Sequence, residues 1–164
     1  MSKTDYDLSK QFQDDLIKAY NKVAPYCWSQ LEAYERAVRQ PAPRYYVSAR
    51  QAAQILSPMV RGDFSKVDKM SERRKQLYYS LFQKVVELSE KRRFYGQSLQ
   101  YIVDFAVCQP APQFFVSASS IAHIRSFLKR GLYDDDGKPV TIPWRVRSYA
   151  KLKAKREKQK AKVQ

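Results

Sequence analysis

The sequence contains few of the residues on which common catalytic sites depend. Its 164 residues include one histidine, two cysteines and four glycines. A Cys–His or Ser–His pair would therefore have to use His123, and the glycines form no cluster able to cradle a phosphate. Residues 134–137, Asp-Asp-Asp-Gly, lack the spaced ligands and distal glutamate of a calcium loop, and so predict a turn. We expect a protein that is not an enzyme and needs no metal or other cofactor.

Cysteine pairs and long hydrophobic runs are also missing. Cys27 and Cys108 are the two thiols of a chain without a signal-like start. Such usage is typical of free, reduced cysteines in an intracellular protein, and we expect a cytoplasmic location. No apolar run approaches the roughly 20 residues that a membrane helix requires, so we expect no membrane partner.

One segment of the chain occurs twice. Residues 40–49 are QPAPRYYVSA and residues 109–118 are QPAPQFFVSA, so the second copy follows the first at an offset of 69 positions. Apolar positions on both sides match at the same offset. A repeat at a fixed offset indicates one structural unit used twice. We therefore divide the chain into a first helical repeat, a second helical repeat and an unrepeated remainder: residues 1–66, 67–131 and 132–164.

Each repeat has the pattern of three helices. Apolar residues recur three and four positions apart before Pro25, which predicts a first helix that ends there. Ser29 and Ser48 stand three residues ahead of Glu32 and Gln51, the spacing of a capping box. The predicted helices are residues 8–24, 29–40 and 48–62 in the first repeat, and residues 72–91, 98–107 and 117–131 in the second. The sequence thus predicts an all-α fold of two tandem three-helix repeats.

The remainder is different in composition. The turn at residues 134–137 precedes Val140-Thr141-Ile142, and together they predict a possible short hairpin. After Pro143 the chain has good helix formers but few apolar residues, which predicts a helical or disordered extension. This tail is strongly basic, with nine lysines and arginines against the single Glu157: Arg145, Arg147, Lys151, Lys153, Lys155, Arg156, Lys158, Lys160 and Lys162.

The net charge of +15 favours a polyanionic partner. Contacts from the tail to nucleic-acid phosphates would be salt-dependent and mostly independent of sequence. Two shorter basic clusters, residues 73–75 and 91–93, lie at the ends of the long central helix and extend the possible footprint. A solubilising tail, or an arm that docks on an acidic protein surface, is the alternative interpretation.

The outer faces of the two third helices are polar and carry no acid. Arginine, glutamine, serine and histidine side chains there suit base edges in a major groove or a phosphate backbone, although an ordinary solvated face has the same pattern. The proline-containing connection is too long for a standard helix-turn-helix motif. The candidate nucleic-acid-binding residues on these faces are Arg50, Gln54 and Arg61 in the first repeat, and His123 and Arg130 in the second.

The repeated motif has two interpretations of its own. Its prolines enforce an extended spacer that precedes two adjacent aromatic residues, Tyr45-Tyr46 or Phe114-Phe115. In the structural interpretation one ring of each pair fills the core and the following serine starts a helix. In the functional one, the other ring remains exposed as a stacking platform for a base.

The motif PAPRYYVS, with its variant PAPQFFVS, resembles a duplicated PAPRFYVS-like motif of small uncharacterised proteins from gut Bacteroidetes and their phages or mobile elements. The resemblance covers the two motif regions and implies no activity or site residues. It implies a setting, an accessory protein of a mobile genome, which fits DNA handling and a virion component equally.

We therefore expect a non-enzymatic nucleic-acid-binding accessory protein, with DNA and RNA both open as partners. Tail residues would contact phosphates, and the third helices would orient the complex. The alternative is a structural or adaptor protein, for example a phage virion component, whose duplicated modules bind protein partners. A homodimer formed through the repeats is a further possibility.

Overall fold

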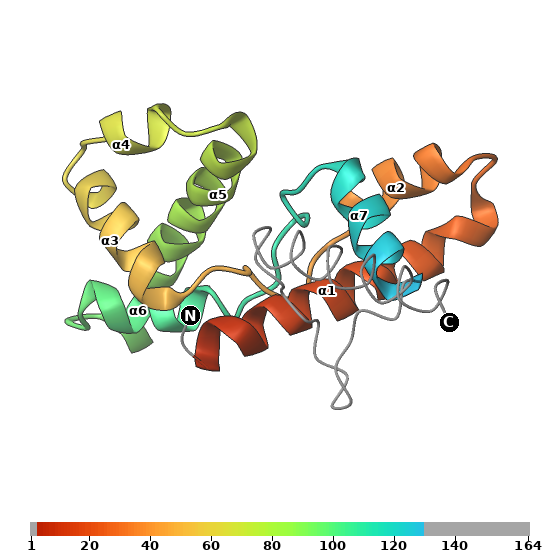
Figure 1. Ribbon diagram of the computed structural model, residues 1–164. Helices are drawn as coiled ribbons and strands as arrows, with labels where there is room; N and C mark the ends of the chain where they lie inside the picture. Colours follow the sequence, from red (N-terminus) through yellow and green to blue (C-terminus); the bar gives the residue numbers. More distant parts are fainter. Residues whose placement is uncertain (1–2, 130–164) are drawn as a thin grey trace, which may run out of the picture. The chain divides into compact units, whose positions relative to one another are not determined.

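The protein is described here by a computed structural model, which covers residues 3–129 and the side chains of residues 7–126. This part of the chain is all-α, as predicted, and its one β-type pairing is an isolated bridge. The predicted hairpin and the end of the last predicted helix, residues 130–143, lie outside the described residues. The elements (Figure 1) are α1 (Lys3–Val23), η1 (Ala24–Tyr26), α2 (Gln30–Val38), α3 (Ala49–Val60), α4 (Ser65–Asp68), α5 (Glu72–Ser89), η2 (Arg92–Phe94), α6 (Leu99–Ala106) and α7 (Ala118–Lys129).

Serine caps begin three of these helices. At α2 the Ser29 hydroxyl accepts the N–H of Glu32 at 3.1 Å, and the Glu32 carboxylate accepts the N–H of Trp28 at 2.9 Å. This reciprocal pair satisfies N–H groups that have no partner inside the helix. The hydroxyls of Ser48 and Ser98 cap α3 and α6 by accepting the N–H groups of Gln51 and Tyr101, both at 3.3 Å. The predicted helix starts at these serines are confirmed, whereas the short helix α4 was not predicted.

The third helix of each repeat packs with the other repeat. Helix α3 packs on α5 and α6. Helix α7 lies against α1 and α2 (Figure 1). There the Arg125 guanidinium donates to the hydroxyls of Tyr20 and Tyr34, both at 2.9 Å. We call α1, α2 and α7 the first bundle, and α3, α4, α5 and α6 the second bundle. The sequence repeats are therefore not the packing units.

The two proline motifs cross where the helices are exchanged. Ala42 and Ala111 form a reciprocal antiparallel bridge, with N–H···O distances of 3.0 and 2.9 Å. Each motif also bonds the end of the other repeat's second helix: the Tyr45 N–H donates to Val107 at 3.0 Å, and the Phe114 N–H donates to Val38 at 3.1 Å. In each pair of bonds, the residues of one bond correspond to those of the other bond at the 69-residue offset of the repeat. Such reciprocity is the signature of approximate twofold symmetry.

The bundles differ at one pair of equivalent central positions. In the second bundle Leu56 of α3 and Val103 of α6 are fully buried. The equivalent positions in the first bundle hold Arg125 and Tyr34. The Arg125 guanidinium lies 4.4 Å from the centre of the Tyr20 ring, so a cation on aromatic rings replaces an aliphatic contact. The first bundle therefore depends on polar contacts where the second uses packing.

This difference gives a stability prediction. Arg125→Ala should lower the free energy of unfolding by about 1.5–3 kcal/mol, because it removes two phenol hydrogen bonds and the contact with Tyr20. Urea unfolding followed by circular dichroism would measure the loss. Arg50→Ala, on the exposed face of α3, is the matched control and should change stability by less than about 0.5 kcal/mol. Equal stability of the two variants would show that α7 is not held through Arg125.

Candidate nucleic-acid interface

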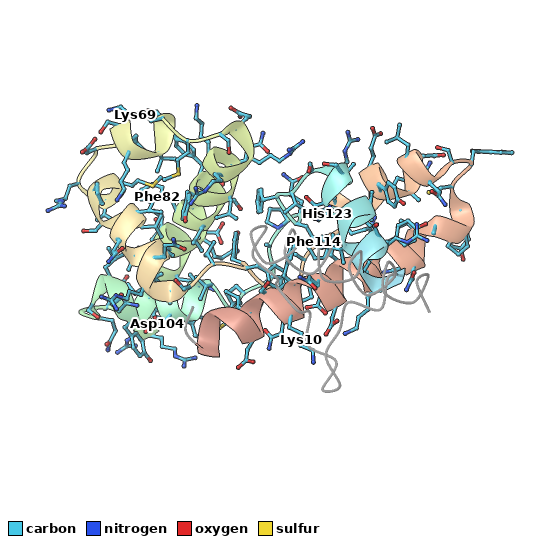
Figure 2. The ribbon with its side chains drawn as sticks, viewed as in Figure 1. Lys10, Lys69, Phe82, Asp104, Phe114 and His123 are labelled. Atoms are coloured by element: carbon cyan, nitrogen blue, oxygen red, sulfur yellow. The ribbon has the colours of Figure 1, made fainter. Side chains whose placement is uncertain are left out.

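The structure separates the two polar helix faces that the sequence singled out. Arg50 and Gln54 are exposed on α3, in the second bundle, and Arg61 is exposed at the C-terminal cap of that helix. His123 is exposed on α7, in the first bundle (Figure 2). The two faces therefore belong to different bundles. The other predicted site residues lie outside the described residues: Arg130, Arg145, Arg147, Lys151, Lys153, Lys155, Arg156 and Lys158.

Positive charge is concentrated on the second bundle. Residues 49–106 contain eleven lysines and arginines against six aspartates and glutamates, whereas residues 3–38 and 118–129 together contain seven against six. Within the second bundle, Lys75 and Lys84 are half-buried and form ion pairs with Glu72 and Glu87. The other nine basic side chains are exposed and form no ion pair with any described residue. This surface therefore carries an excess of positive charge.

Part of the basic surface borders a groove between the repeats. A depression of about 290 Å³ lies between α2 and α5, and its lining includes Arg39, Arg73 and Glu35. Gln76 and Gln113 also line it, and the Gln113 side chain donates to Gln76 at 3.5 Å. Guanidinium and amide groups in such a groove are suited to phosphate oxygens. Sequence reasoning missed this groove, because three distant segments form it only through the helix exchange.

The matching groove on the other repeat has mixed charge. It holds about 300 Å³, and Arg44, Asp7 and Asp104 are among its lining residues. The Arg44 guanidinium donates to Gln11 at 3.4 Å and lies 3.9 Å from the Cys108 sulfur, and its buried Nε has no hydrogen-bond partner within the described residues. Two carboxylates on its wall disfavour a polyanion. The two equivalent grooves have thus diverged in charge.

The aromatic pairs of the motif form the junction and do not form an exposed platform. Tyr45 and Phe114 are buried, as one ring of each pair was expected to be. Tyr46 and Phe115 are half-buried, so the hypothesis of an exposed stacking ring is wrong. Tyr45 stacks on Phe115 with ring centroids 6.3 Å apart. Tyr46 stacks on Phe114 at 6.1 Å. Each second ring is covered because its partner comes from the other repeat.

Exposed aromatic residues lie instead at two turns. Tyr26 and Trp28 project from the turn between α1 and α2. Tyr95, in the turn between α5 and α6, and Tyr101, in the first turn of α6, are also exposed. Tyr26 and Tyr95 occupy equivalent positions of the repeat. The same residue at the same offset of 69 was the sequence signal that could have pointed to these turns.

Other ligand classes find little support in the described part of the chain. Within it, no three His, Cys, Asp or Glu side chains gather closely enough to hold a metal ion. No helix among residues 3–129 is both long and apolar enough to span a bilayer. Comparison of the sequence and the structure with protein-family models, curated proteins and solved structures finds no match.

The junction makes stability sensitive to alkaline pH. The Tyr46 hydroxyl donates to the Asp15 carboxylate at 2.6 Å. Burial, and then this bond to Asp15, raise the pKa of Tyr46 above its ordinary value of about 10. The folded state thus binds the phenolic proton more tightly than the unfolded state. The resulting stability is fully present below pH 10 and is lost as pH rises above it.

Tyr46→Phe tests this linkage. We expect the variant to lose about 1–2 kcal/mol at pH 8, and to show a shallower fall in stability than the native chain above pH 10. Urea unfolding at a series of pH values would measure both effects. Tyr26→Phe, at an exposed tyrosine, should leave the profile unchanged. Parallel profiles for all three proteins would show that Tyr46 does not contribute to the alkaline transition.

Proposed function

We propose that this protein is a non-enzymatic nucleic-acid-binding accessory protein. The second bundle and the basic tail would contact phosphates. The observation that carries the proposal is the set of nine exposed basic side chains on residues 49–106 that form no ion pair within the described chain. Concentrated like charges repel each other and add nothing to folding, whereas a phosphate backbone neutralises them and releases counterions.

The α3 face would orient the complex. Arg50, Gln54 and Arg61 follow one another at intervals of four and seven residues, which places them on one side of the helix. Arginine and glutamine can donate to phosphates or to base edges. The tail, with its nine basic residues between Arg145 and Lys162, would supply most of the salt-dependent affinity.

A second candidate function has one observation in its favour. The turn between α1 and α2 exposes three large apolar side chains, Tyr26, Trp28 and Leu31. Exposed aromatic residues in a cluster are typical of protein–protein contacts. A structural or adaptor role, with this turn docked on a partner protein, is the alternative.

Binding can be located with variants of the full chain. Fluorescence anisotropy of labelled DNA and RNA over a salt series would give the affinity and its salt slope. Arg50→Gln with Arg61→Gln should weaken binding and reduce the slope by roughly 2, about 1 for each lost phosphate contact. Changing Lys151, Lys153, Lys155 and Lys158 to Gln should reduce it further.

The matched control changes the same charge on the first bundle. Lys18→Gln with Lys22→Gln removes two positive charges from α1 and should alter the salt slope by less than half as much. Equal losses from the two double variants would show that net charge alone attracts the ligand. Absence of binding to DNA and RNA at about 0.15 M salt would favour the adaptor role.

A further inference from the structure

The turn between α5 and α6 exposes two aromatic rings that the fold does not require to be outside. Tyr95 is 67% exposed and Tyr101 is 46% exposed, whereas the adjacent Phe94 is buried. The Tyr101 ring centroid lies 6.2 Å from that of Phe94, which in turn lies 5.2 Å from that of Phe105. The ring of Tyr101 thus rests on an aromatic base that continues into the bundle.

Backbone hydrogen bonds hold this turn in place. The N–H of Phe94 donates to Lys91 at 2.8 Å, and the N–H of Gln97 donates to Phe94 at 3.1 Å. Gly96 has a φ of +75°, a conformation that favours glycine. The Ser98 hydroxyl then caps α6. A turn fixed in this way loses little conformational entropy when a ligand binds.

The rings stand beside three consecutive cations. Lys91, Arg92 and Arg93 are exposed and form no ion pair with any described residue. The Arg93 guanidinium lies 5.7 Å from the Phe94 ring centre and 5.3 Å from that of Phe105, so aromatic contacts hold its charge at the turn. Three acids lie near this run: Glu90, Glu87, which pairs with Lys84 at 2.7 Å, and Asp104, which accepts the side-chain N–H of Gln100 at 2.7 Å.

We infer that this turn is a stacking site for single-stranded nucleic acid, in which bases stack on Tyr95 and Tyr101 while adjacent phosphates contact Lys91, Arg92 and Arg93. The inference rests on the proposed nucleic-acid binding and specifies the ligand class. Sites for single strands combine aromatic rings with a cationic track. Bases of a duplex are already stacked on each other, so exposed rings add affinity mainly for an unpaired strand.

The chain contains an internal comparison for this site. Tyr26 occupies the position of Tyr95 in the first repeat, and Trp28 lies two residues beyond it. The positions equivalent to Lys91, Arg92 and Arg93 hold Lys22, Val23 and Ala24, so that turn has one basic residue in place of three. The two turns thus share exposed rings, but the α5–α6 turn alone adds a run of three cations.

The test compares one strand with its duplex. A fluorescein-labelled oligothymidylate of about 20 nucleotides, long enough for a typical single-strand site, and a mixed-sequence duplex of equal length would be titrated with the full chain. We expect Tyr95→Ser with Tyr101→Ser to raise the Kd for the single strand about fivefold or more, and the Kd for the duplex by less than about twofold. Tyr95→Phe should retain single-strand affinity because it keeps the stacking ring.

Matched variants separate the possible failures. Tyr26→Ser and Trp28→Ser should each change single-strand affinity by less than about twofold. A larger loss from either, or equal losses for strand and duplex in the Tyr95/Tyr101 variant, would overturn the inference. An unchanged Kd for the single strand in the Tyr95/Tyr101 variant would also overturn the inference. The proposed function would still stand in that case, because the native chain binds nucleic acid. Failure of the native chain to bind either ligand would overturn both.

The position of the bases can be measured directly. An oligothymidylate containing 5-iodouracil would be photocrosslinked to the full chain, and the modified peptide identified by mass spectrometry. We expect crosslinks at Tyr95 or Tyr101. Crosslinks found only at Trp28 would assign stacking to the α1–α2 turn and contradict the inference.

Discussion

The antiparallel crossing of the two proline motifs is the contact on which the described fold depends. Its central residues, Ala42 and Ala111, are almost fully buried, and their backbones exchange two hydrogen bonds. Prolines on both sides of each alanine keep the segments extended and remove competing N–H donors. Alanine is required by space, because a larger side chain at this depth would force the segments apart. Beyond the crossing each chain segment can only enter the opposite bundle, so this one contact determines which helices share a core.

The exchange also creates surfaces that neither repeat has alone. Arg39, Arg73 and Gln113 come from three separate parts of the chain and meet at one groove because α2 is followed by a crossing segment. In the equivalent groove, Arg44 occupies the position of Gln113, and Asp104 occupies the position of Glu35. The scaffold therefore presents the same hollow twice with different chemistry. Divergence of this kind is possible because groove residues contribute less to folding than the buried crossing does.

Local structure was predictable from sequence, whereas the tertiary arrangement was not. Ser29, Ser48 and Ser98 mark helix starts through bonds to residues three positions away, and such local chemistry is visible in the sequence. The partner of α3 is set by contacts between residues far apart in the chain, and a repeat pattern is identical whether its helices stay or exchange. The same limit explains the aromatic motif. The functional interpretation placed the second ring of each pair outside because alternation in an extended segment points one ring outward, and only the crossing supplies the ring that covers it.

Comparison of the two bundles distinguishes what folding requires from what it leaves free. Both bundles share the crossing, and each has a serine-capped helix, α2 or α6, that follows a turn with an exposed tyrosine, Tyr26 or Tyr95. The second bundle has in addition an excess of exposed cations and the run Lys91-Arg92-Arg93. The first bundle folds with nearly balanced charge, so the shared architecture does not need that excess. Repulsion among the excess cations destabilises the folded state, and a polyanionic ligand reduces this repulsion. The asymmetry of charge on an approximately symmetric scaffold is therefore the feature on which the proposed nucleic-acid binding rests.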